Sequence, residues 1–429
     1  MKIRFPAALF TTVLATATLH GLAWDPLSSA EPPSIGCGWS PVGNTLFPPD
    51  LEARYWKAVV PLRAGQQIRV SGKFPHARYI AYALQGPGGS GDAVHDVAIA
   101  PDAGSTNPFL VGADRNAPAR SYTLTVVPGS PPHSGRPPNT LYSGEGALAE
   151  HLVTVIYRIY DVDAAVDPVS GGVGLPAVVA VDDTGKMTNT CDNNRGGGVT
   201  AGASFAALPA GADHGAGAFG TNPPSWQKFV NTATVYAQIL HNDLLGDALY
   251  DRVSAATSGG APPGGLGANV DNQYVSALVN SNYGKVLAFT GAMPTHADTF
   301  QGQSPMTGGQ VRYWSMCSEK LATTQAVQCI PDHAVPVRND GSFTLVVSAP
   351  PQDRPPRNAE EACGVAWLPM GTAPGTVLIM RNMLADPTFA QSIGRSELNH
   401  EAGTMGAYYP RGQYFTDAAA YEATGCKGR

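Results

Sequence analysis

The stretch Gln66–Tyr82, QQIRVSGKFPHARYIAY, decides the fold class of this chain. Ile68 and Val70 alternate with polar residues, and this period of two is typical of a half-buried β-strand. The segment Gly72–Pro75 interrupts the pattern, because glycine tolerates positive φ and proline cannot donate to a strand ladder. The run Arg78–Ala83 then resumes with residues that suit a pleated surface. The stretch therefore predicts two strands joined by a tight turn.

The overall composition favours the same fold class. The chain has 429 residues, which is long for one core and predicts two or three domains. It contains 49 glycines and 37 prolines but only 14% charged residues, a mixture typical of short strands joined by turns. The net charge is −6 and basic residues do not cluster, so we expect neither nucleic acid nor an anionic membrane as a partner.

The N-terminus has the pattern of a secretory signal. Lys2 and Arg4 precede the apolar run Phe5–Leu22, and Ala23 and Ala30 suit the small-residue rule for cleavage. The run is too short and too polar for a stable membrane span. The sequence therefore predicts a signal peptide over residues 1–30 and a secreted or periplasmic mature protein.

Six cysteines follow the expected signal: Cys37, Cys191, Cys317, Cys329, Cys363 and Cys426. An even number in an oxidising compartment predicts three disulfides. Fifteen pairings are formally possible, and Cys317–Cys329 is the pair that we expect, since it closes a short loop. No CxxC spacing occurs, so we expect no metal bound by cysteines.

An internal repeat divides the chain. Six landmark pairs occur in one order, separated by 218 to 234 residues: Gly72 and Gly291, Arg78 and Arg312, Asp102 and Asp332, Leu124 and Leu345, Arg136 and Arg354, Arg158 and Arg381. Self-similarity at this long period indicates two similar domains and not a solenoid. The alternative is two unrelated β-domains with similar turns. We therefore expect a mainly β protein with an irregular lead-in (31–51), a first β-sandwich (52–182), a linker (183–280) and a second β-sandwich (281–429).

The expected linker contains a helical segment. Ser225 is a suitable N-cap, and apolar residues recur at three- and four-residue steps over 226–248. A shorter helical run is expected at Val275–Asn280. The polar cluster Asn269–Tyr274 precedes it, and this cluster either caps the run or contributes to a ligand site.

The two copies differ in one connection. The tight turn Phe74–Ala77 of the first copy corresponds to the long segment Pro294–Gln310 in the second, which carries His296, Asp298, Gln301 and Gln303. Long loops on rigid β-scaffolds are frequent binding sites, and the alternative is a surface elaboration.

Three motifs resemble a known family. Arg312–Cys317 (RYWSMC), Trp367–Pro369 (WLP) and Val377–Leu384 (VLIMRNML) are similar, in that order, to the FWS, NWLP and LRLYWP-type motifs of an uncharacterised bacterial envelope-associated domain. The resemblance implies a jelly-roll β-sandwich for each of two divergent copies and fixes no substrate. The sequence departs from the pattern at Ala366, where the family has Asn, and the first copy lacks both tryptophans. Asn269, Asp271 and Tyr274 also resemble an Asn-Asp-Tyr patch of the domain that commonly precedes this one.

The candidate ligand contacts are polar or aromatic side chains on the repeated strands and in the polar cluster. Arg158 and Arg381 lie among apolar neighbours and need acceptors, for which we expect Asp102 and Asp332 or backbone carbonyls. These arginines either form structural ion pairs or bind an anionic or sugar-like ligand, and the aromatic residues either stack on a sugar or belong to a core. The candidates are Tyr79, Asn269, Asn272, Tyr274, Arg312, Tyr313, Trp314 and Arg381.

A calcium site is a weaker hypothesis. Asp161, Asp163 and Asp167 follow a strand at near-regular spacing, and hard cations prefer several carboxylates. The segment lacks the glycine and terminal glutamate of an EF-hand, so solvated loop carboxylates are the alternative. We otherwise expect no metal site.

Three functions remain open on the sequence. The first is a secreted protein that binds a carbohydrate or small polar ligand. The second is an extracellular hydrolase or lyase, whose acid and base would come from Asp271, His296, Asp298 and Glu401, with Arg312 or Arg381 stabilising charge. The third is a structural surface protein. No nucleotide-binding or common hydrolase motif occurs, so we expect no cofactor, and nothing indicates an oligomeric state.

Overall fold

Two sets of strands make up the described part of the chain. The structure, a computed structural model, describes residues 38–42, 50–86, 89–144, 150–189, 220–229, 269–320, 325–349, 355–371 and 375–426. The expected signal peptide (1–30), Cys37, Cys191, most of the lead-in and the greater part of the linker lie outside these residues.

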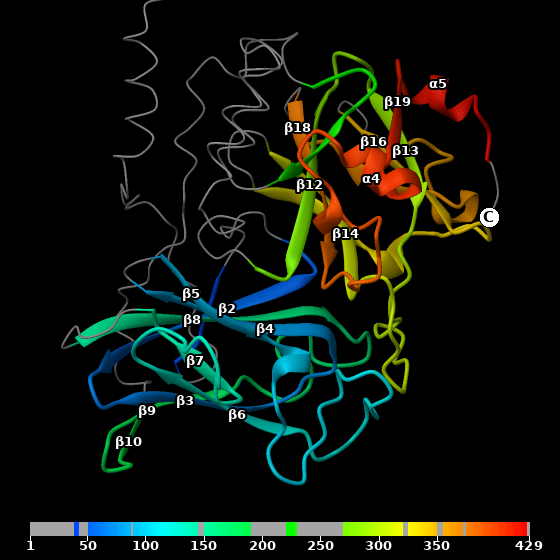
Figure 1. Ribbon diagram of the computed structural model, residues 1–429. Helices are drawn as coiled ribbons and strands as arrows, with labels where there is room; N and C mark the ends of the chain where they lie inside the picture. The colour runs from blue at the N-terminus through cyan, green and yellow to red at the C-terminus, as the bar shows by residue number, and fades with distance from the viewer. Residues whose placement is uncertain are drawn as a thin grey trace, which may run out of the picture. The chain divides into compact units, whose positions relative to one another are not determined.

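The first set forms two five-stranded sheets (Figure 1). In hydrogen-bonding order, one sheet contains β1 (Ser40–Pro41), β2 (Ala53–Arg63), β8 (Glu150–Val162), β4 (Ala77–Gly86) and β5 (Gly89–His95). The other contains β10 (Met187–Asn189), β9 (Ala177–Val181), β3 (Gln67–Lys73), β6 (Ser121–Val127) and β7 (Thr140–Tyr142). The strands predicted within Gln66–Tyr82 are β3 and β4, and they lie in different sheets.

The second set repeats this order. One sheet contains β11 (Trp226–Phe229), β12 (Asn272–Asn280), β18 (Gly375–Met383), β14 (Tyr313–Lys320) and β15 (Ala326–Pro331). The other contains β17 (Ala366–Pro369), β16 (Ser342–Ser348), β13 (Val286–Ala292) and β19 (Arg411–Phe415). The pairs β6–β7 and β16–β17 are both parallel. A mainly β fold with two sandwich-like bodies is therefore confirmed, and their strand orders agree with the predicted repeat.

The helices among the described residues are short. They are η1 (Asp96–Ala98), η3 (Asp332–Ala334), η4 (Glu361–Cys363), η5 (Ile393–Arg395), α4 (Glu401–Met405), η6 (Gly406–Tyr408) and α5 (Ala418–Glu422). None of them is long and apolar enough to cross a membrane.

Each sandwich has its own core between its two sheets. Trp56, Ile80 and Tyr82 belong to the first core, and Trp314 and Leu378 belong to the second. Because side chains alternate across a strand, every second residue of β4 and β14 points away from its own core. These outward side chains include the candidates Tyr79 and Tyr313, whereas the candidate Trp314 points into the second core.

Glycine is favoured at the two repeated positions 72 and 291 for the same reason. Gly72 lies opposite Tyr122 on the neighbouring strand, and Gly291 lies opposite Phe343. A Cβ atom would come within 2.9 Å of the Tyr122 hydroxyl in the first case and within 3.2 Å of the Phe343 ring in the second. Both positions therefore favour glycine, because the aromatic ring lies across the backbone.

The helix predictions are wrong at Trp226–Phe229 and at Val275–Asn280. Trp226–Phe229 is the strand β11, and Val275–Asn280 is part of the strand β12; residues 230–248 lie outside the described residues. β12 is buried on both faces, so its near-continuous apolar run hides the period of two that identifies a strand. Both strands belong to a sheet of the second sandwich, which thus includes residues assigned to the linker.

The predicted disulfide Cys317–Cys329 is confirmed. It joins β14 to β15 at directly paired positions. A second disulfide, Cys363–Cys426, closes a segment with a sequence separation of 63 residues and attaches the C-terminal region to η4. The described cysteines therefore form two bridges.

Trp314→Ala should destabilise the second sandwich by about 3–5 kcal/mol. Trp314 is 1% exposed, and its ring centroid lies 5.3 Å from that of Phe343 in the core. Denaturant unfolding measures the loss. The control Val111→Ala, at a side chain that is 72% exposed, should change the free energy of unfolding by less than about 0.5 kcal/mol. Equal effects of the two substitutions would show that Trp314 does not support a core.

Candidate functional site

The outward faces of β4 and β14 meet in a buried interface between the two sandwiches. One apolar cluster combines side chains from both, and we call it the inter-sandwich cluster: Ala53, Tyr55, Tyr79, Ala81, Tyr160, Tyr313 and Met383. Tyr160 of the first sandwich packs edge-to-face on Tyr313 of the second, with ring centroids 5.6 Å apart. The aromatic residues on these faces are therefore enclosed by protein.

Two arginine–aspartate pairs cross the interface in opposite directions. Arg78 of the first sandwich donates to both oxygens of Asp332 in the second, at 3.1 and 3.0 Å. Arg312 of the second donates to both oxygens of Asp96 in the first, at 3.2 and 3.1 Å. Each arginine also donates to the backbone carbonyl of the other, at 3.4 and 3.2 Å. The repeated residues thus exchange equivalent contacts.

The two aspartates hold equivalent positions. Asp96 begins η1 and Asp332 begins η3. Asp96 accepts the backbone N–H of Ile80 at 3.2 Å, and Asp332 accepts that of Trp314 at 3.0 Å. The structural counterpart of Asp332 is therefore Asp96, and the sequence pairing with Asp102 is wrong, because Asp102 instead accepts the Thr123 hydroxyl at 3.4 Å.

A second exchange surrounds Asp50 and Asn269. Tyr313 and Ser315 donate to Asp50 at 3.0 and 2.8 Å, and Arg381 forms an ion pair with the same carboxylate. On the other side, Tyr79 donates to Asn269 at 3.1 Å and to Asp271 at 2.6 Å. Asp332 is therefore not the partner of Arg381, contrary to expectation, because it is already bound by Arg78.

The charged groups in these contacts are buried, which affects their pKa values and the cost of removing a partner. The side chains of Arg78, Asp332, Arg381 and Asp50 are fully buried. Burial alone would lower the pKa of Arg381, but Asp50 and three nearby tyrosines outweigh it and raise that pKa. Burial, reinforced by the bond to Asp271, likewise raises the pKa of Tyr79 and keeps its hydroxyl a donor. Removing one partner of a buried pair leaves a charge without compensation.

The long segment Pro294–Gln310 reaches the first sandwich, and we call it the crossing loop. Thr299 accepts Nε of Arg78 at 2.6 Å. Met306 is buried, and its backbone bonds to Gly112 and Ala113 at 2.8 and 3.0 Å. The middle of this loop therefore contacts the other sandwich through Thr299 and Met306.

The candidate catalytic residues have separate partners. Asp271 lies 3.0 Å from His95, whose pKa is raised mainly by this bond, and His296 lies 3.7 Å from Asp332. Asp298 is exposed on the crossing loop. Glu401 is buried and accepts the backbone N–H of Lys228 at 2.6 Å. The structure does not bring these four together as an acid–base pair.

The candidate ligand contacts lie inside the protein. Arg312 retains 12% exposure of its side chain, and the other seven are buried: Tyr79, Asn269, Asn272, Tyr274, Tyr313, Trp314 and Arg381. Among the described residues, none of the eight offers an exposed aromatic face for a sugar.

The three aspartates of the predicted calcium site each contact a different residue. Asp161 lies 2.8 Å from Arg78, Asp163 binds Arg115 at 2.7 Å, and Asp167 accepts the Ser170 hydroxyl at 2.6 Å. Their carboxylates therefore neutralise or cap different groups. Asp161 alone belongs to a mixed set of potential metal ligands, together with Asp332 and His333.

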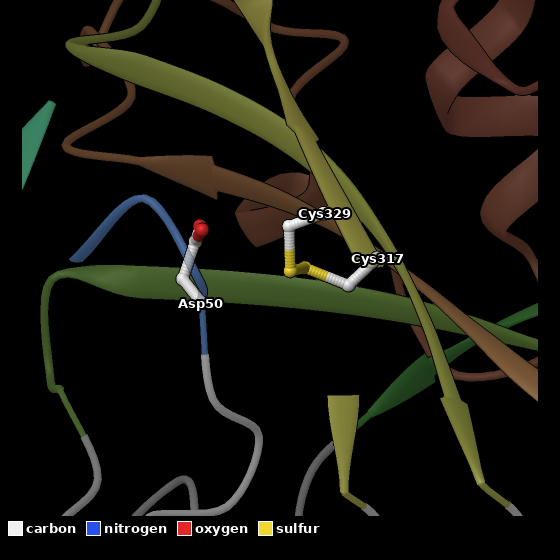
Figure 2. A group of neighbouring side chains, drawn as sticks. All are labelled: Asp50, Cys317 and Cys329. Carbon is white, nitrogen blue, oxygen red and sulfur yellow. A yellow bond between two sulfur atoms is a disulfide. The ribbon is translucent and has the colours of Figure 1, made fainter. Parts of the chain in front are cut away.

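A second set of potential metal ligands lies beside the first disulfide. Figure 2 shows the carboxylate of Asp50 next to Cys317 and Cys329, whose sulfur atoms are bonded to each other. Metal binding by cysteine requires thiolates, and a disulfide supplies none. This group is therefore part of the interface and not a metal centre.

A depression of about 490 Å³ opens on the second sandwich. It is lined by Thr295, Gly309, Gln310, Asp386, Thr388, Phe389, Ala390 and Gln391. The ends of the crossing loop form one wall, and the segment after β18 forms the other. The two walls are joined by the bond from the Asp386 N–H to the Gln310 carbonyl, at 2.9 Å.

The polar groups of this depression are fixed by local bonds. The Asp386 carboxylate accepts the N–H of Thr388 at 2.8 Å and its hydroxyl at 2.5 Å, and chiefly the hydroxyl lowers the pKa of Asp386. Gln310 donates to the Tyr408 hydroxyl at 2.9 Å. The depression therefore presents an ionised carboxylate beside amides and hydroxyls.

The sequence reasoning missed Asp50, Asp96 and the residues after β18. One signal was available for Asp50. The spacing of 219 residues that separates Gly72 from Gly291 also separates Asp50 from Asn269. Extending the repeat toward the N-terminus would have included Asp50, whereas no pattern marked Asp386.

Comparisons with known proteins add no function. No family model matches the chain, and no curated protein sequence matches it. An uncharacterized protein from Burkholderia cenocepacia is similar in structure, with a TM-score of 0.46 and 11% identity over 88% of this chain and 79% of that one. The VPA0106 protein from Vibrio parahaemolyticus has a TM-score of 0.39 and 12% identity over 87% of this chain and 91% of that one. The resemblance to the envelope-associated domain therefore stays a prediction.

Arg312→Met and Asp96→Asn should each destabilise the protein by about 3–5 kcal/mol, because each leaves a buried charge or acceptor unpaired. The double variant should lose less than the sum, with a coupling energy of about 0.5–3 kcal/mol. Denaturant unfolding of the four proteins measures this cycle. The control Arg357→Met, at a side chain that is 79% exposed, should cost at most about 1 kcal/mol. Strict additivity would contradict the pairing.

Glu319→Gln should stabilise the protein at neutral pH. Glu319 lies on β14 and is fully buried, and its carboxylate accepts no hydrogen bond from the described residues. Burial raises its pKa well above 4.5, although Arg381 opposes the shift. The stability that protonated Glu319 contributes is present below the unfolded pKa and is lost as pH rises toward the folded pKa.

The advantage of the glutamine variant should therefore increase above about pH 4.5, the range in which the unfolded carboxyl ionises. Urea unfolding at several pH values measures it. Glu397→Gln, at an exposed position, serves as the control and should show no such trend. A constant difference between wild type and Glu319→Gln at every pH would exclude a raised pKa.

Proposed function

We propose that this chain is a secreted or periplasmic protein that binds a small hydroxyl-rich ligand of the sugar class in the depression between the crossing loop and the segment Asp386–Gln391. The observation that carries the proposal is the lining of this depression. One aspartate, two glutamines and two threonines are among the residues that line one concavity. Its volume of about 490 Å³ falls in the range of small-molecule sites.

The chemistry of the lining favours hydroxyl groups. The carboxylate of Asp386 accepts hydrogen bonds. The amides of Gln310 and Gln391 contain both donors and acceptors, some of which already bond to Thr295, Tyr408 and Met405. Among the described residues, only Thr388 hydrogen-bonds the carboxylate of Asp386, so acceptor capacity remains for a ligand. A bond from a sugar hydroxyl to an ionised carboxylate is stronger than a neutral one.

The other functions have less support. A hydrolase or lyase needs an acid and a base near one another, and the four catalytic candidates have separate partners. A purely structural protein needs no polar concavity, and the binding experiment separates that role from the proposed one. Export is supported by the sequence pattern of residues 1–30 and by the two disulfides.

Asp386→Asn should weaken binding of the saccharide about 10-fold or more, because one charge-assisted bond contributes about 1.5–3 kcal/mol. The ligand is first found by a thermal-shift screen of neutral mono- and disaccharides and polyols, with organic acids and amines for comparison, and its affinity is then measured by calorimetry. Asp340→Asn is a matched control, since Asp340 accepts the N–H and hydroxyl of Ser342 at 2.9 and 2.6 Å in a similar turn outside the depression. The proposal fails if no saccharide or polyol binds, or if both variants bind equally well.

A further inference from the structure

Two carboxylates and two imidazoles gather where the crossing loop meets the first sandwich. Asp161 is near the end of β8, Asp332 and His333 form the start of η3, and His296 lies on the crossing loop. Nδ1 of His333 lies 3.0 Å from Oδ1 of Asp161, and Nδ1 of His296 lies 3.7 Å from Oδ1 of Asp332. The ligand atoms of Asp161, Asp332 and His333 lie within 4.8 Å of one another.

We propose that Asp161, Asp332 and His333 bind a divalent transition metal of the zinc type. His296 lies beside this set, and its Nδ1 is also 3.4 Å from the Ala297 carbonyl oxygen. Zinc is bound at about 2.0–2.1 Å by histidine nitrogen and at a similar distance by carboxylate oxygen, and its structural sites are tetrahedral. The ligand atoms of such a site lie about 3.3 Å apart. The two nitrogen–oxygen distances in this group bracket that value.

The hydrogen bonding of Asp161 and His333 supports a metal ion bound between them. Asp161 is 2% exposed, yet neither of its carboxylate oxygens accepts a hydrogen bond from the described residues, and Nδ1 of His333 makes none either. The closest atoms of the two side chains are at hydrogen-bond distance without the geometry of a bond. Buried polar atoms without hydrogen bonds are rare, and an absent ion is one recognised explanation.

Arg78 holds the carboxylates without neutralising them. Its Nη2 lies 2.8 Å from Oδ2 of Asp161, and its Nη1 lies 3.0 Å from Oδ2 of Asp332. One guanidinium facing two carboxylates leaves one negative charge, which favours a bound cation. Contacts of this kind orient ligating carboxylates in metal sites.

A neighbouring aromatic side chain also holds the ring of His333 in place. The ring of Phe300 stacks on His333 with centroids 3.8 Å apart and an interplanar angle of 6°. Small exposed fractions of the two imidazoles, 12% for His333 and 17% for His296, give an entering ion a path. Asp161 belongs to the first sandwich, and Asp332 and His333 belong to the second, so a bound metal would join the two sandwiches.

The region around Asp96, the counterpart of Asp332 in the first sandwich, provides a control for the metal-binding experiment. There Arg312 binds Asp96, and His95 lies 3.0 Å from Asp271, whose other oxygen accepts the Tyr79 hydroxyl. Among the described residues, no third potential ligand joins this pair within metal-binding distance. His95→Asn should therefore leave metal binding intact.

The experiment is calorimetric titration of the full mature chain with Zn²⁺ after chelator treatment, with Ca²⁺ as a second probe. Wild type and His95→Asn should bind one Zn²⁺ in preference to Ca²⁺, and Zn²⁺ should raise their melting temperatures. His333→Asn should weaken Zn²⁺ binding about 100-fold or more and lose that thermal shift. Asp161→Asn is the second ligand variant, and it should also weaken Zn²⁺ binding if His333→Asn does not fold.

Three results would overturn the proposal. They are no Zn²⁺ binding by wild type, equal affinity in wild type and both ligand variants, and equal loss in His95→Asn.

Discussion

The exchange of arginine and aspartate between the two sandwiches is the constraint on which the rest of the interface depends. Arg78 binds Asp332, Arg312 binds Asp96, and the side chains of three of the four are almost fully enclosed. Buried charges are tolerated only when they are paired and hydrogen-bonded. The relative register of β4 and β14 is therefore specified by these pairs, whereas the apolar contacts around them are less directional.

This constraint explains where the other polar residues lie. Asp50 and Asn269 each precede the second strand of their sheet and accept a tyrosine hydroxyl from the other sandwich. The crossing loop adds an asymmetric contact, because only the second copy has it. The chemically distinctive residues are thus used in the association of the sandwiches, and we place the proposed ligand in the depression beside Asp386.

The sequence predicted the strands around Gly72, the repeat and the disulfide Cys317–Cys329, since each depends on a local pattern or spacing. It predicted helix at β11 and β12. For β12 the reason is that a strand buried on both faces has no alternation to detect. It also could not decide between a ligand and an ion pair for Arg381. That decision depends on Asp50, which lies more than three hundred residues away in sequence. Long-range contacts of this kind leave no periodic signal.

Differential scanning calorimetry of the mature, oxidised chain tests the central claim most directly. If the buried pairs make the two sandwiches one cooperative unit, the protein should unfold in a single transition, with a calorimetric enthalpy close to the van't Hoff enthalpy. Two resolved transitions in the wild-type protein, or a calorimetric enthalpy about twice the van't Hoff value, would contradict that account. Either result would mean that each sandwich unfolds without its partner and that the charge exchange does not couple them.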